Sequence, residues 1–153
     1  MGYWLFKSEP DVFSIDHLAG EPGQTTFWDG VRNYQARNFL RDTVKNGDKV
    51  LFYHSNTEPN AVVGVCEVVR EGYPDHTQFD SDHDHYDPKS SPAQPTWYMV
   101  DIKLKQKFKT PVTLQAIKDN PKLAEMTLVQ RGNRLSVFPV KKEEFQEIVR
   151  MGK

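Results

Sequence analysis

The stretch WDGVRNYQAR at Trp28–Arg37 combines a large aromatic side chain, a tight-turn signal and the start of a helix that carries two arginines. Asp29-Gly30 favours a tight turn, so Trp28 is expected to lie close to the backbone of Val31–Tyr34. Helix N-termini offer unpaired N–H groups that suit polar or anionic ligands. An indole beside amide, guanidinium and phenol groups is typical of a pocket that stacks a flat ring and reads its edge. A buried tryptophan beside a solvated helix start fits the stretch equally well.

This stretch leads into the clearest predicted helix, where apolar residues recur at helical spacing from Asn33 to Val44. Alternating or β-branched runs predict strands at Gly2–Ser8, Asp48–Ser55, Ala61–Val69, Thr96–Phe108 and Leu135–Val140. Further helices are predicted at Ser14–Leu18, Thr113–Asp119, Pro121–Met126 and Lys142–Met151. Because strands and helices do not alternate regularly, we expect an α+β domain around a bent or barrel-like antiparallel sheet and not a doubly wound parallel sheet.

Composition predicts one soluble globular domain covering residues 1–153. No apolar run approaches the roughly 20 residues of a membrane helix, and the start of the chain does not resemble a signal peptide. The single cysteine, Cys66, excludes an internal disulfide and lies in a β-branched run that predicts a core residue and not a nucleophile. These features together favour a cytoplasmic location.

The net charge of −1 disfavours proteins that hold nucleic acid by backbone charge alone. The net charge does not exclude a protein that reads a single base in a pocket, because such a protein needs fewer phosphate contacts. Arg131 and Arg134 lie beside a turn, and with Arg32 and Arg37 they could form a basic rim for phosphates. Ordinary surface charge is the alternative interpretation.

Two strand ends carry further candidate side chains. Lys7-Ser8-Glu9 precedes Pro10, which ends the strand and presents a lysine, a hydroxyl and a carboxylate. A solvated strand end fits these residues as well. In the second strand, Tyr53 and Ser55 share one face, and His54 lies on the other. His54 could act as a general base, but a core or rim histidine is the simpler interpretation.

The polar segment Glu71–Pro95 is too long for an ordinary connection and is expected to be a functional or a mobile loop. It contains aspartates at the spacing of the first three ligands of a calcium loop, namely Asp80, Asp82 and Asp84. His85 stands where that motif requires glycine and Ser91 where it requires glutamate, so an EF-hand is excluded. His83 and His85 could ligate a transition metal, but the sequence shows no complete zinc-ligand set. No metal site is therefore predicted.

Six stretches of the chain, in order and at suitable spacing, resemble the EVE domain. They are YWLFKSEP at Tyr3–Pro10, WDGVRNYQARNFL at Trp28–Leu40, VLFYHS at Val50–Ser55, EGYPD at Glu71–Asp75, YDPKS at Tyr86–Ser90 and RLSV at Arg134–Val137. The resemblance implies a PUA-like fold, in which a small β-barrel is flanked by short helices. It also implies a non-catalytic binding module without a cofactor, whose partner is DNA or RNA carrying a modified base. Animal members carry a basic extension that this chain lacks, so the chain looks like the bacterial-type, stand-alone form.

A base pocket follows from the resemblance and from the chemistry of these residues. The predicted base-pocket set is Lys7, Ser8, Glu9, Trp28, Val31, Arg32, Asn33, Tyr34, Tyr53 and Ser55, and the predicted phosphate rim is Arg37, Arg131 and Arg134. Trp28 is expected to stack on the base, so that Trp28→Ala removes affinity while the fold survives. Arg32→Ala is expected to weaken binding to all sequences alike. Neither a chelator nor the replacement of His83 and His85 together should change the affinity for the ligand.

Two alternatives stay open on the sequence. One is an enzyme acting on nucleic acid, with Lys7, Glu9 and His54 as acid–base groups. The other is an adaptor that binds a protein through the Glu71–Pro95 segment.

Overall fold

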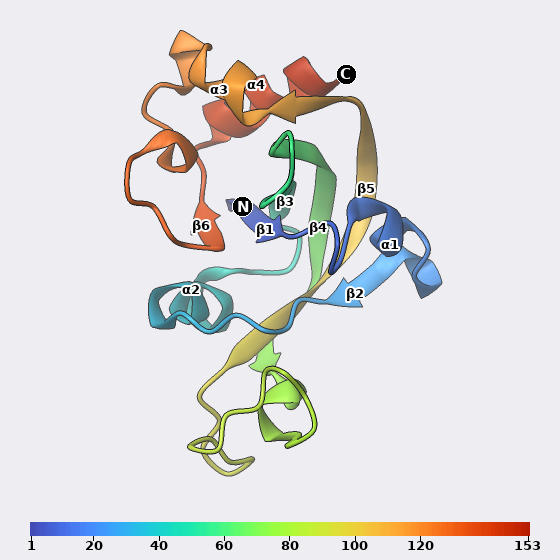
Figure 1. Ribbon diagram of the computed structural model, residues 1–153, viewed down its shortest axis with the longest axis vertical. Helices are drawn as coiled ribbons and strands as arrows, with labels where there is room; N and C mark the ends of the chain where they lie inside the picture. Colours follow the sequence, from blue (N-terminus) through green and yellow to red (C-terminus); the bar gives the residue numbers. More distant parts are fainter.

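The computed structural model describes residues 1–153. Runs of consecutive apolar residues, which are buried on both faces of the central strands, build one mixed six-stranded sheet. Its strand order is β2-β5-β4-β3-β1-β6, as Figure 1 shows. The strands are β1 (Tyr3–Ser8), β2 (Thr25–Phe27), β3 (Lys49–His54), β4 (Ala61–Pro74), β5 (Tyr98–Thr113) and β6 (Val137–Pro139). Only the β1–β3 pair is parallel, and every other neighbouring pair is antiparallel.

Short helices connect the strands at the predicted places. They are α1 (Ile15–Ala19), α2 (Tyr34–Asn38) with a π-helical continuation (Phe39–Thr43), α3 (Leu114–Lys118) and α4 (Lys142–Gly152). Single 3₁₀ turns lie at Pro22–Gln24, His76–Phe79, Pro121–Leu123 and Thr127–Val129. Side-chain caps fix three of the α-helix starts. Ser14 accepts the His17 amide at 3.1 Å, Asn33 accepts the Ala36 amide at 3.0 Å, and Thr113 accepts the Ala116 amide at 3.1 Å. None of these helices has the length and hydropathy of a membrane-spanning segment.

The two faces of the sheet carry separate cores because successive side chains of a strand point to opposite faces. Trp4 and Phe6 of β1 belong to the larger core, which includes apolar residues of α1 and α2. Leu5, between them, belongs to the smaller core with Ile117 of α3 and Ile148 of α4. Figure 1 accordingly shows α3 and α4 at one end of the molecule, while the connection between β4 and β5 forms the opposite end.

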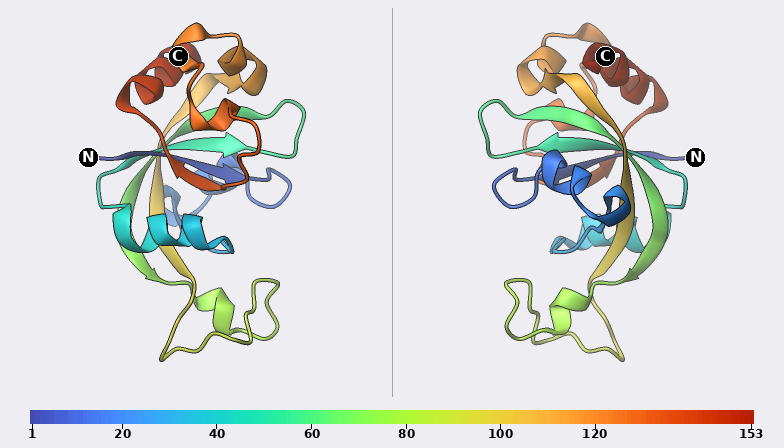
Figure 2. Two further views of the ribbon diagram at one scale, coloured as in Figure 1. Left: turned by 90° about the vertical axis from the view of Figure 1, so that its left-hand side faces the viewer. Right: turned by 90° about the vertical axis from the view of Figure 1, so that its right-hand side faces the viewer.

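The sheet is strongly bent but open. Register shifts interrupt the pairing of β4 with β5 at four places, and both strands curve along the length of the molecule (Figure 2). The order of the strands ends in β2 and β6, which do not pair with each other. The prediction of an α+β fold without a doubly wound parallel sheet is therefore confirmed. The closed barrel is not confirmed.

Two boundaries differ from the sequence-based prediction. β4 continues to Pro74, five residues beyond the predicted Val69, because β5 supplies partners for Tyr73 and Pro74. The predicted loop Glu71–Pro95 therefore begins as a strand. β2 was not predicted, since three residues are too few to show a hydrophobic pattern.

We expect Cys66 to be inert in the folded protein. Its side chain is fully buried in the larger core, and burial raises the pKa of the Cys66 thiol far above its usual value. A thiol-labelling reagent at pH 8 should leave the native protein unmodified and should modify one equivalent after unfolding in guanidinium chloride. Native labelling at the rate of the unfolded chain would show that the thiol is accessible.

Candidate functional site

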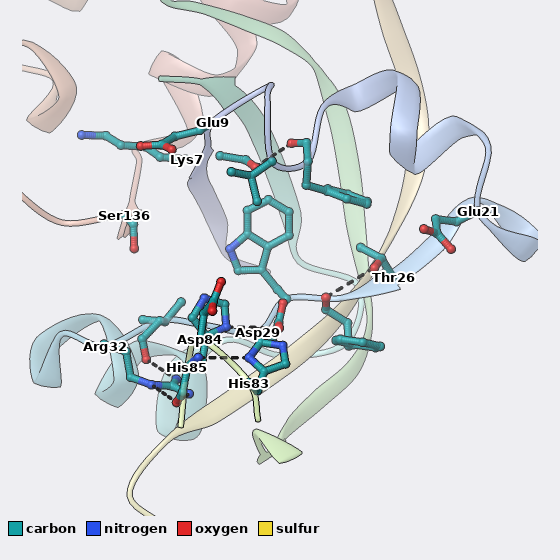
Figure 3. A pocket seen from close by; sticks show the side chains of 17 residues that line it. Lys7, Glu9, Glu21, Thr26, Asp29, Arg32, His83, Asp84, His85 and Ser136 are labelled. Carbon is teal, nitrogen blue, oxygen red and sulfur yellow. Dashed lines mark hydrogen bonds and ion pairs between the residues drawn. The ribbon is translucent and has the colours of Figure 1, made fainter. Parts of the chain in front are cut away.

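A pocket of about 790 Å³ lies where the end of β1 faces the turn after β2 (Figure 3). The end of β1 contributes Lys7, Ser8 and Glu9 to its lining. The chain that follows β1 adds Val12 and Phe13, and Glu21 lies directly before the 3₁₀ turn at Pro22–Gln24. The remaining lining residues are Thr26–Arg32, His83–His85 and Ser136. Segments from four regions of the sequence therefore meet here.

Trp28 is both a wall of this pocket and a core residue. Its side chain is only 7% exposed and belongs to the larger core. The indole lies against the rings of Phe6 and Phe52, each with a centroid distance of 5.4 Å, and its edge faces Phe13 at 6.5 Å. The two sequence-based interpretations of Trp28, pocket wall and buried aromatic, thus describe the same side chain.

A buried carboxylate fixes the turn that follows Trp28. Asp75 accepts the Gly30 amide at 2.8 Å, an Arg32 guanidinium nitrogen at 3.1 Å, and the Thr77 amide and hydroxyl at 2.8 and 2.5 Å. Burial alone would raise the pKa of Asp75, but the hydrogen bonds from Thr77, Gly30 and Arg32 outweigh burial and hold this pKa below its usual value. The turn needs glycine at position 30, where φ is +80° and the ring of His85 lies in the place of a Cβ.

Arg32 links the turn at Asp29-Gly30 to the connection between β4 and β5. Its Nε and Nη2 donate to the carbonyl of His85 at 3.2 and 2.7 Å, and Nη1 donates to Asp75. The guanidinium also lies over the ring of Trp97, 5.3 Å from its centroid. Arg32 therefore lines the pocket with its donors turned to the protein and not toward a bound phosphate.

The connection between β4 and β5 is anchored by Gln78, which is fully buried. Its amide nitrogen donates to the carbonyls of Asp75 and Trp97 at 2.7 and 2.8 Å. Its oxygen accepts the hydroxyl of Ser90 at 2.6 Å and the amides of Thr96 and Trp97 at 3.1 and 2.9 Å. Buried polar networks that are fully satisfied specify one conformation, so His83–His85 are held at the pocket.

The end of β1 supplies the main charged groups of the opposite wall. Lys7 is half-buried with its ammonium over the ring of Phe138, and burial lowers the pKa of Lys7. Glu9 accepts a hydrogen bond from the side-chain amide of Asn56. The Ser8 hydroxyl donates to the carbonyl of Phe13 at 2.6 Å and so positions the pocket wall.

Comparison with known proteins shows the family of this chain. The family model described as the EVE domain matches residues 2–151. The chain belongs to the EVE domain family. Mouse thymocyte nuclear protein 1 is 44% identical over 164 residues, which cover 96% of this chain and 72% of that protein.

Solved EVE-family structures share the fold. The crystal structure of the human THYN1 protein in complex with 5-methylcytosine-containing DNA has a TM-score of 0.93 and 41% identity, covering all of this chain and 98% of that one. A hypothetical protein from Leishmania major has a TM-score of 0.92 and 48% identity, covering 99% of this chain and 94% of that one. The PUA-like fold implied by the resemblance fits these relatives.

Six of the ten predicted base-pocket residues line the pocket, and the other four lie elsewhere. Lys7, Ser8, Glu9, Trp28, Val31 and Arg32 line it. Asn33 and Tyr34 lie outside it, because Asn33 caps α2 and Tyr34 stacks on Trp97 at 5.0 Å. Tyr53 lies in the smaller core on the other face of the sheet, and Ser55 donates its amide to Ser8 without lining the pocket.

The predicted phosphate rim is also dispersed. Arg37 donates to the carbonyl of Thr96 at 2.7 Å, and Arg131 and Arg134 are exposed before β6 and do not line the pocket. His54 accepts the amide of Ile15 at 3.1 Å, outside the pocket, and burial lowers the pKa of His54. Lys7, Glu9 and His54 therefore do not line one common pocket.

Several lining residues were not predicted as pocket residues. Val12, Phe13 and Phe27 stand in no motif, and Ser136 stands in the RLSV stretch, where it was given no role in the pocket. Only the folded chain shows these residues together. Asp29 lies within the opening stretch but was interpreted only as a turn residue. His83 and His85 were considered only as possible metal ligands in a functional or mobile loop, whereas they line the pocket beside Asp29.

Proposed function

We infer that this protein binds a nucleic acid that carries a modified base and that it receives this base in the pocket beside Trp28. The observation that supports this most is the human relative, whose structure was solved with 5-methylcytosine-containing DNA and which matches the whole of this chain. DNA with 5-methylcytosine is therefore the first ligand to test, and RNA the second.

The lining suits a flat ring with polar edges. Apolar walls come from Val12, Phe13, Phe27, Trp28 and Val31. Lys7, Glu9 and Ser136 place a cation, a carboxylate and a hydroxyl on one side of the pocket. Stacking on an aromatic side chain provides affinity for any base, so these polar groups must select among bases by leaving a wrong edge unpaired.

The methyl group by itself provides limited selectivity. Burial of one methyl contributes about 0.8 kcal/mol, which corresponds to a roughly fourfold preference over unmodified cytosine. A base in a duplex must also be flipped out, at a cost of a few kcal/mol. We therefore expect a single strand to bind more tightly than the matching duplex.

The salt dependence of binding should be shallow. The net charge is −1, and Arg32 and Arg37 donate to groups of the protein itself. Each phosphate neutralised by a protein cation contributes about 0.7–0.9 to the slope of log K against log salt. A pocket reader with few such contacts differs in this slope from a protein that binds the backbone.

Titration of labelled oligonucleotides, followed by fluorescence anisotropy, tests the proposal. Oligonucleotides with one 5-methylcytosine or one cytosine should differ in affinity by at least about fourfold, and Lys7→Met should weaken binding of both. Lys118→Met is the matched control, because this exposed lysine lies on α3, outside the pocket. Equal affinity for both oligonucleotides would contradict base reading, and an altered base in the product would favour the enzyme alternative.

A further inference from the structure

Three metal-ligating side chains meet at the edge of the pocket. Asp29 comes from the turn after β2, and His83 and His85 come from the connection between β4 and β5 (Figure 3). One ligand atom of each residue lies within 4.8 Å of the other two. The His-x-His pair seen in the sequence thus gains a carboxylate that is far away along the chain.

One ring nitrogen in this cluster lacks a partner. Nδ1 of His85 is buried and makes no hydrogen bond, and Asp29 Oδ2 lies 3.5 Å from it. Most buried polar atoms are satisfied, and an unsatisfied one costs free energy. A cation placed between His85 and Asp29 would satisfy both the nitrogen and the carboxylate.

The backbone around the cluster is fixed before any ligand arrives. Arg32 holds the carbonyl of His85 with two donors, and the ring of His85 packs onto the turn at Gly30. The rings of His83 and His85 have centroids 4.8 Å apart. A site with ligands held in this way loses less conformational entropy on binding.

We propose that Asp29, His83 and His85 bind one divalent transition metal ion, with Zn²⁺ as the ion of choice. Two imidazoles and one carboxylate are ligands that Zn²⁺ accepts, and three protein ligands leave a fourth position for water or for an atom in the pocket. Nδ1 of His83 accepts the His85 amide at 3.0 Å, which leaves Nε2 of His83 as its ligand nitrogen.

The experiment uses metal-free protein and Zn²⁺ or Co²⁺ alone. Calorimetry should show one equivalent of Zn²⁺ bound, and Co²⁺ should produce visible absorption bands typical of low coordination number. Asp29→Asn, His83→Ala and His85→Ala should each weaken Zn²⁺ binding by at least the roughly 10–100-fold that loss of a supporting residue costs. Asp29→Asn is the cleanest variant, because asparagine before glycine favours the same turn.

Two control variants separate a built site from general affinity for a polar loop. Asp84→Asn removes an exposed carboxylate between the two histidines, and His76→Ala removes an exposed histidine of the same connection. Both should leave Zn²⁺ affinity unchanged. Absence of saturable binding, or equal weakening by the control and ligand variants, would overturn the proposal.

This test is independent of base binding, since it contains no nucleic acid. The metal-free protein should still bind a modified oligonucleotide, because the stacking walls do not include the metal ligands. Failure of one proposal therefore leaves the other intact.

Discussion

Replacing Trp28 with alanine is expected to lower the free energy of unfolding by about 3–5 kcal/mol. The indole is 7% exposed and packs against Phe6, Phe13 and Phe52, so its removal leaves a cavity between the sheet and the pocket. This loss is a large part of the roughly 5–15 kcal/mol that stabilises a typical domain. The fold is still expected to survive this change, with much reduced stability. Denaturant unfolding at neutral pH measures the effect.

Phenylalanine variants separate the role of Trp28 in packing from its role in binding. Trp28→Phe and Trp4→Phe each replace a buried indole of the larger core with a smaller phenyl ring. Of the two tryptophans, only Trp28 lines the pocket. Both variants should therefore be destabilised, and only Trp28→Phe should lose oligonucleotide affinity. Loss of a base–aromatic stack on substitution by alanine costs about 1–3 kcal/mol, and phenylalanine, which keeps a smaller ring, should lose part of this. A stable Trp28→Ala protein would show that the indole does not support the core.

Elements with a strong local pattern could be predicted from the sequence. β1 and β3 are short runs of consecutive apolar residues, and α4 repeats its apolar residues at helical spacing. Ser14 and Asn33 are typical capping residues. The second half of β4 could not be predicted in this way. Its residues Arg70–Pro74 are polar or exposed, and they form a strand only because β5 pairs with them.

The same distinction explains the site. Trp28, Val31 and Arg32 are local to one turn, so the sequence indicated that they lie together. Asp75 lies 43 residues after Arg32, so the sequence could not show that the Asp75 carboxylate accepts a hydrogen bond from the Arg32 guanidinium. Phe13, Ser136 and His83–His85 join the pocket through tertiary packing alone, which leaves no mark on the local pattern.

Asp75→Asn is expected to lower the free energy of unfolding by about 3 kcal/mol at neutral pH, in the range found when one partner of a buried ion pair is removed. Both carboxylate oxygens of Asp75 accept from two donors each. An asparagine turns one oxygen into a donor that faces other donors, which removes charge-assisted hydrogen bonds. The turn at Gly30 and the connection at Thr77 should loosen together.

The pH dependence provides the second measurement of Asp75. The folded pKa of Asp75 lies below the ordinary value of about 3.9 that applies in the unfolded chain. Its contribution to stability is therefore complete above that value and is lost as the pH falls through the folded pKa. The gap in unfolding free energy between the native protein and Asp75→Asn should be constant near neutral pH and should shrink in acid. Other carboxylates with lowered pKa values, such as Glu67 and Asp87, are present in both proteins and cancel in this difference. A gap that is independent of pH would show that the side chain acts through its shape, because a charged carboxylate must lose its advantage once it is protonated.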